Sequence, residues 1–213
     1  FMESDAIRFV AKHHQIGIPF PDAGAQLLVQ IDGNSAADLD DQQNAVLAAV
    51  GPVARDQIVA VDDDNRARLW SARRGIRTAI EKESPVFLAE DCVVPRAEIP
   101  SLVAEVKEFL RTQGIRSVLF GHAGDGNVHI DALRDTLSDE DWYALVPMMR
   151  KGIYAIAFRH EGTITGEHGI GCVRRDYMDL AFSSDELDLM RRIKAAFDPN
   201  LHRWLDSAVA AIN

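Results

Sequence analysis

Cysteine is scarce in this chain of 213 residues, which contains only Cys92 and Cys172. Two thiols cannot build a disulfide framework or a thiolate metal cluster. The chain also lacks the roughly 18–20 uninterrupted apolar residues that span a bilayer, and its first residues lack the basic-then-apolar pattern of a secretory signal. Together these absences predict a cytoplasmic protein.

Positive charge is also in short supply, because 23 Lys and Arg residues face 33 Asp and Glu residues, for a net charge of -10. A surface this acidic repels phosphate backbones and anionic lipid heads, so we expect no nucleic-acid partner. An anionic substrate would need a local cationic or metal-centred site. Hydrophobic residues at 47% and charged residues at 26% are typical of a globular protein, and we expect one domain over residues 1–213.

Apolar periodicity predicts strands that mostly alternate with helices. The clearest pattern is a helix over 97–114, followed by two strands around a glycine-rich turn that requires an antiparallel hairpin. The fold class expected is therefore an α+β sandwich with a helical C-terminal segment. Pro147 should kink or divide the helix that contains it. The expected strands cover 25–33, 57–61, 86–94, 117–120 and 127–133, and the expected helices cover 34–51, 67–80, 97–114, 139–160 and 183–197.

The segment GHAGDGNVH, residues 121–129, joins three glycines to two histidines. If His122 and His129 each lie at the mouth of one strand, their imidazoles can converge as metal ligands or as an acid and a base. Strand alternation places Asn127 and Asp131 on the same face as His129. The plain alternative is a structural hairpin, to which we give about equal weight on chemistry alone.

A second glycine-rich segment, GTITGEHGIG at residues 162–171, places Glu167 beside His168. Two histidines and one carboxylate are a recurrent catalytic set for a divalent metal, and they leave coordination positions open for substrate. The sequence therefore suggests His122, His129 and Glu167 as metal ligands. His168 remains available to move protons.

These two segments resemble signature blocks of the C-terminal domain of FAD-linked oxidases that act on 2-hydroxyacids, the glycolate oxidase, D-lactate dehydrogenase and D-2-hydroxyglutarate dehydrogenase group. EDCVVPR (90–96) resembles a third block, and LWSARRGIR (69–77) resembles the stretch in which the family places a substrate-binding arginine. The resemblance covers about residues 1–200 and implies a ferredoxin-like cap over FAD held by a separate N-terminal domain. We expect that domain to be absent from this chain, which starts abruptly at Phe1.

The resemblance also implies roles for individual residues. By position, His122, His129 and Glu167 match the family's metal ligands, with zinc expected and manganese or iron as alternatives. His168 matches the catalytic base and Arg73 the anchor for the substrate carboxylate, and Asn127 is expected to contact the cofactor. Arg77 is expected to bind substrate, although the hydroxyglutarate enzymes have threonine there.

The implied reaction is the oxidation of a D-2-hydroxyacid to a 2-oxoacid. Its implied partners are the small hydroxyacid, the FAD-binding domain and an unidentified electron acceptor, which could bring the protein to a membrane surface. A homodimer is one candidate for the oligomeric state. After Asn200 the family's usual ending is replaced by LHRWLDSAVAAIN.

Two other functions remain open at this point. The same metal ligands could serve a free-standing hydrolase, in which the metal generates hydroxide. Alternatively, the chain could be a non-catalytic subunit of a flavoprotein complex, with glycine-rich loops used only for docking. A nucleotide site of its own is not expected, because the glycines of 121–126 do not follow the dinucleotide-binding spacing.

Overall fold

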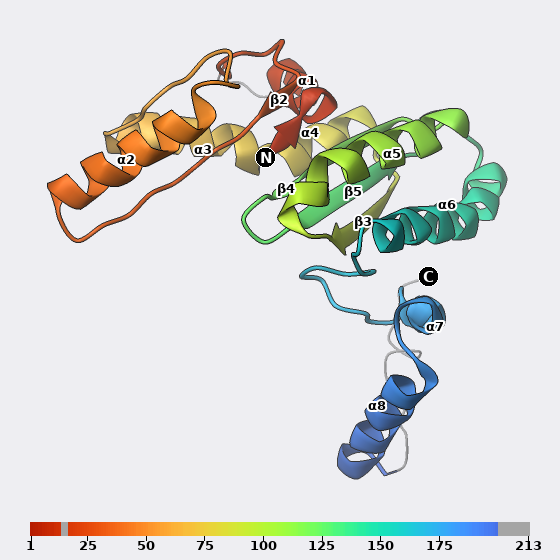
Figure 1. Cartoon of the computed structure of the whole chain (residues 1–213). Helices are drawn as coiled ribbons and strands as arrows, with labels where there is room; N and C mark the ends of the chain where they lie inside the picture. Colours follow the sequence, from red (N-terminus) through yellow and green to blue (C-terminus); the bar gives the residue numbers. More distant parts are fainter. Residues whose placement is uncertain (14–16, 200–213) are drawn as a thin grey trace. The chain divides into compact units, whose positions relative to one another are not determined.

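The computed structural model describes residues 1–13 and 17–199 of the chain. These residues divide into two compact units, the first ending at Val86 and the second beginning at Phe87 (Figure 1). The departure from the family's usual ending lies outside the described residues. Among the helices within the described ranges, none is long and apolar enough to cross a membrane.

The first unit is mostly helical. Its short strands β1 and β2 pair antiparallel, and α1 packs against α4. Four residues of these two helices are fully buried: Ile7, Val10, Ile76 and Ile80. Each such side chain contributes roughly 1.5–3 kcal/mol by leaving water. The elements are β1 (Met2–Glu3), α1 (Ser4–His13), β2 (Ala25–Gln26), α2 (Ala36–Val50), α3 (Asp63–Arg74) and α4 (Ile76–Glu83).

Several sequence-based expectations fail in this unit. The strand expected over 25–33 ends at Gln26, and 57–61 forms no strand. A segment of alternating apolar residues forms a strand only when a neighbouring strand pairs with it and one of its faces is buried. Here Val29 and Ile58 are exposed. The single helix expected over 67–80 is two helices separated at Gly75, and the first begins earlier because Asp62 caps it.

The second unit is an α+β sandwich built on three antiparallel strands. β5 lies between β3 and β4, which confirms the predicted hairpin. Helices α5 and α6 pack against each other, α5 contacts β4 and β5, and α6 contacts β3 (Figure 1). The principal elements are β3 (Phe87–Val93), α5 (Ile99–Thr112), β4 (Ser117–His122), β5 (Asn127–Leu133), α6 (Asp139–Arg159), α7 (Met178–Ala181) and α8 (Ser184–Phe197).

The helices of this unit follow their sequence signals closely. The apolar stripe of α5 is buried at Leu102, Val106 and Leu110, as its three- and four-residue spacing predicted. Ser183 and Glu186 form the predicted capping box of α8. Pro147 does not divide α6, which runs through it as one helix. The predicted α+β class, with antiparallel strands, covering helices and a helical C-terminal segment, is confirmed.

The turn between β4 and β5 depends on Gly126. Its φ is +78°, and a Cβ built on it would lie 2.0 Å from the carbonyl oxygen of Val94. We expect Gly126→Ala to lower the free energy of unfolding by more than about 2 kcal/mol, because left-handed backbone alone costs alanine about 1–2 kcal/mol. Gly124→Ala is the matched control, since its Cβ would meet nothing within 4 Å. Urea unfolding of both variants tests this, and equal losses would contradict it.

Candidate metal and substrate site

The β4–β5 hairpin brings His122 and His129 together. His122 ends β4 opposite Asn127, and His129 lies opposite Phe120 within β5, so directly paired residues place both imidazoles on one face of the sheet. The two ring centroids are 5.5 Å apart. The side chain of His129 is only 8% exposed and packs against the ring of Phe120, whereas that of His122 is 47% exposed. The hairpin therefore holds one imidazole firmly and presents the other at the surface.

Glu167 reaches the same point from a distant part of the chain. The segment after α6 is attached to β3 by paired backbone hydrogen bonds between Val93 and Thr163, the shorter of which is 2.9 Å. From there the chain turns so that Glu167 Oε1 lies 3.2 Å from His129 Nε2 and Oε2 lies 3.8 Å from His122 Nε2. The three side chains predicted to act together are thus adjacent in the fold.

The geometry of this cluster suits a divalent cation. One ligand atom from each of His122, His129 and Glu167 lies within 4.8 Å of the other two. Two atoms that each lie about 2.0–2.2 Å from one zinc ion are at most about 4.4 Å apart, so a modest side-chain rotation brings the three onto one ion. The exposure of His122 and Glu167 leaves one side of the cluster facing solvent, where a small molecule could complete the coordination.

His168 stands beside the cluster without belonging to the three-residue set. Its Nε2 lies 3.4 Å from Glu167 Oε1, and its ring centroid is 5.5 Å from that of His129. The side chain is 51% exposed. A half-exposed imidazole at this distance can exchange a proton with a molecule bound at the cluster.

Three buried charged residues that sequence reasoning missed form a network of ion pairs at β3. Glu90 and Asp91 of β3 both pair with Arg174, whose side chain is 7% exposed. Burial raises the pKa of Asp91, but hydrogen bonds from the backbone N–H groups of Glu167, Gly166 and His168, with the Arg174 charge, bring it below its ordinary value. The sequence did offer one signal for this network, namely two acidic residues inside an otherwise apolar strand. Carboxylates are rarely buried unless they are paired, so these two predicted a buried cationic partner.

Asn127 packs directly against the loop that carries Glu167. It is buried, and neither atom of its side-chain amide has a hydrogen-bond partner among the described residues. A Cβ on Gly166 would lie 2.4 Å from Asn127 Oδ1, so only glycine lets the two segments approach this closely. A buried amide without a partner is costly, and it suits a group that a bound molecule would engage.

The sequence of the chain matches the model of a known protein family. The model described as "FAD linked oxidases, C-terminal domain" matches residues 1–201. The chain belongs to this family.

Curated relatives agree with that membership. The glycolate oxidase subunit GlcD of Bacillus subtilis is 30% identical over 200 residues, covering 93% of this chain and 42% of the relative. The D-lactate dehydrogenase of Anaerostipes hadrus is 30% identical over 209 residues, covering 94% and 44%. The D-2-hydroxyglutarate dehydrogenase of Xanthomonas citri pv. viticola is 35% identical over 149 residues, covering 68% and 31%. The chain spans less than half the length of these relatives.

The two arginines that the resemblance to FAD-linked oxidases singled out lie in the first unit. Arg73 is in the last turn of α3, Arg77 is in the first turn of α4, and both are half-buried. The histidine and glutamate cluster belongs to the second unit. The roles of Arg73 and Arg77 toward a substrate therefore stay predictions.

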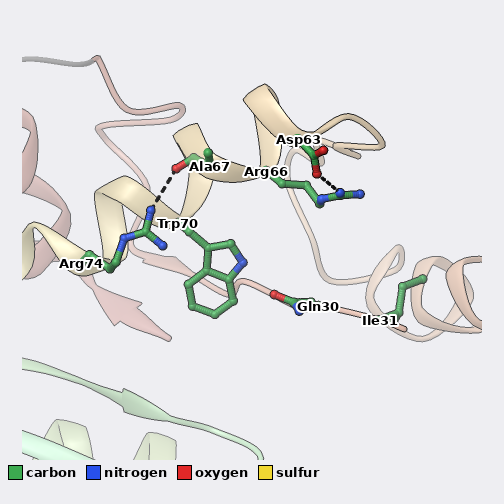
Figure 2. Close-up of a pocket in the computed structure, with 7 residues that line it drawn as sticks. All are labelled: Gln30, Ile31, Asp63, Arg66, Ala67, Trp70 and Arg74. Atoms are coloured by element: carbon green, nitrogen blue, oxygen red, sulfur yellow. Dashed lines mark hydrogen bonds and ion pairs between the residues drawn. The ribbon is translucent and has the colours of Figure 1, made fainter. Parts of the chain in front are cut away.

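A pocket of about 390 Å³ lies within the first unit, and neither Arg73 nor Arg77 is among the described residues that line it. In Figure 2, Arg74 donates to the backbone oxygen of Ala67 and Arg66 pairs with Asp63, so both guanidinium groups already bond to their own chain. We assign this pocket no part in the reaction. Its lining residues are Gln30, Ile31, Asp63, Arg66, Ala67, Trp70 and Arg74.

Proposed function

We propose that this chain is the substrate- and metal-binding part of an FAD-dependent dehydrogenase that oxidises a D-2-hydroxyacid to a 2-oxoacid. The observation that carries the proposal is the convergence of His122, His129 and Glu167, with His168 beside them. The names of the relatives, which include glycolate oxidase, D-lactate dehydrogenase and D-2-hydroxyglutarate dehydrogenase, support this substrate class.

In this proposal, His122, His129 and Glu167 hold one divalent ion, with zinc as the first choice because two imidazoles and a carboxylate are a usual catalytic zinc set. Such an ion, when bound, would lower the pKa of a substrate hydroxyl beside it, as it does for bound water, and would leave room for the substrate. The solvent-facing side of the cluster supports that arrangement.

The remaining roles fall to side chains of this chain. His168 accepts the proton of the substrate hydroxyl at Nε2, since it stands next to the cluster without sharing its ligand set. Arg73 binds the substrate carboxylate, which its planar guanidinium can engage through two parallel hydrogen bonds. Arg77 contributes a second positive charge for substrate. The side-chain amide of Asn127, which has no hydrogen-bond partner among the described residues, contacts the cofactor.

FAD, when bound, would supply the acceptor for the hydride of the substrate's α-carbon. We propose that this chain is the substrate- and metal-binding part of the enzyme and that a companion domain binds most of the FAD. The length of the relatives supports this division, since more than half of each lies beyond the matched region. An electron acceptor would then reoxidise the flavin.

Metal analysis of the purified chain tests the ligand set. After loading with zinc and removal of excess ion, we expect about one bound ion per chain in the wild type and none in His122→Ala. The matched control is His160→Ala, because His160 bonds to Glu98 and Glu105, away from the cluster. Unchanged zinc content in His122→Ala would refute the assignment.

The reaction itself needs the chain joined to a flavin-binding domain. Anaerobic mixing with a panel of D-2-hydroxyacids should bleach the flavin absorbance and release a 2-oxoacid, with L enantiomers as the control. Ester or amide hydrolysis by the chain alone would favour the hydrolase alternative. Flavin reduction that persists at full rate in His129→Ala would favour a non-catalytic subunit.

A further inference from the structure

We propose that Asp91 is a positioning residue that fixes the backbone of residues 166–168, so that Glu167 and His168 reach the His129 imidazole. This inference rests on the proposed function, because it assigns a task to one residue of the ion-pair network at β3. Asp91 itself touches none of the reacting groups in this scheme.

A single oxygen of Asp91 holds three consecutive backbone donors. Oδ2 accepts hydrogen bonds from the N–H groups of Gly166 at 2.8 Å, Glu167 at 2.8 Å and His168 at 3.3 Å. Hydrogen bonds to an ionised carboxylate are shorter and roughly twice as strong as neutral ones. Glu167, the proposed metal ligand, and His168, the proposed base, therefore both lie in the turn whose backbone Asp91 binds.

Asp91 is held in place by its own surroundings. Its side chain is 1% exposed, and its Oδ1 accepts from Arg174 Nη2 at 2.8 Å. Arg174 also donates to the carbonyl oxygen of Gly169 at 3.0 Å, so it ties the far end of the same loop to the same carboxylate. The Asp91–Arg174 ion pair thus binds the loop backbone at Gly166, before Glu167 and His168, and at Gly169, after them.

The sheet register explains why this position matters. Asp91 lies directly opposite His129 in the β3–β5 pairing, and directly paired residues of an antiparallel pair share a face. The spacing between His129 and the Glu167 backbone is therefore set through one strand pair. The glycines of 162–171 allow the loop many conformations, so its order has to come from bonds such as these.

Asp91→Asn tests the inference, because it keeps the size of the side chain and removes its charge. Glu90→Gln is the matched control: Glu90 is the neighbouring buried carboxylate, and its bonds go to Arg150, Tyr154 and Arg174. We measure zinc affinity by competition with a chromophoric chelator. We also measure hydrogen exchange at the amides of residues 166–168 by NMR in the metal-free 213-residue chain.

We expect Asp91→Asn to weaken zinc binding by about 10–100-fold, the usual effect of losing a group that orients a metal ligand. Exchange at the three amides should accelerate, and their resonances should move upfield as the charged acceptor is lost. Glu90→Gln should change both readouts far less than Asp91→Asn, because Arg174 keeps its own bonds to Asp91 and Gly169, while the melting temperature falls. Unchanged affinity and exchange in Asp91→Asn, or equal changes in Glu90→Gln, would overturn the inference.

The exchange measurement separates this inference from the proposed function. If the wild type binds no zinc, the metal assignment fails, yet the amides of 166–168 still report whether Asp91 orders the loop. If Asp91→Asn does not fold, Arg174→Lys replaces it, because that change keeps a positive charge but loses the fork that joins Asp91 to Gly169. Faster exchange at 166–168 in Arg174→Lys supports the inference, and unchanged exchange overturns it.

Discussion

Replacing His168 with glutamine is expected to slow flavin reduction by about 10²–10⁴-fold, the usual contribution of a positioned general base. Glutamine resembles histidine in size and can still form hydrogen bonds, but its amide cannot take up a proton near neutral pH. The zinc content should be unchanged, because the three-ligand set does not include His168. The substitution thus separates proton transfer from metal binding.

The measurement is anaerobic stopped-flow mixing of the flavin-containing protein with a saturating D-2-hydroxyacid, followed through the flavin absorbance. The rate of the variant should partly recover as the pH rises, because hydroxide can then replace the missing base. His160→Gln, which changes a histidine in the α5–α6 ion pairs, should reduce flavin at the wild-type rate. A wild-type rate in His168→Gln would mean that another group removes the proton, and loss of zinc would make His168 a ligand.

Glu90→Ala is expected to lower the free energy of unfolding by about 3–5 kcal/mol, the cost of removing one partner from a buried ion pair. The Glu90 side chain is fully buried and accepts from Arg150 at 2.6 Å and Arg174 at 3.1 Å. It also accepts from the Tyr154 hydroxyl, and burial followed by the Glu90 charge raises the pKa of that tyrosine. Alanine would leave Arg174, which is almost fully buried, with less neutralising charge.

The matched control is Glu105→Ala. Glu105 also pairs with an arginine, Arg159, and with His160, but its side chain is 40% exposed. An exposed pair is worth at most about 1 kcal/mol, so this variant should lose far less stability than Glu90→Ala. Urea unfolding monitored by circular dichroism measures both losses. Similar losses for the two variants would show that burial of the Glu90 ion pairs adds little to the free energy of unfolding.

The second unit could be predicted from sequence and much of the first could not. In the second unit, the stripe of α5, the glycine turn before β5 and the capping box of α8 are local signals, and each element forms where its signal lies. In the first unit, the apolar runs over 27–33 and 57–61 looked like strands but form none in the structure. Pairing is a long-range event that a local pattern cannot report.

The candidate site shows the same division between local and long-range information. Its donors could be predicted, because glycine-rich segments with clustered His122, His129 and Glu167 are unusual in composition. The supporting residues could not, since Asp91 lies 75 residues before Gly166 in the chain and Glu90 lies 84 residues before Arg174. Only the folded chain brings Arg174 and β3 together.

The three proposed metal ligands differ in how rigidly the fold holds them. His122 and His129 belong to a hydrogen-bonded hairpin, whereas Glu167 belongs to a glycine-rich loop. We expect an ion to leave or enter when the loop swings out, without any break in the sheet, because loops open at far lower free energy than core strands. The residence time of the ion would then report on the loop, and any molecule that stiffens the loop would trap the ion behind it.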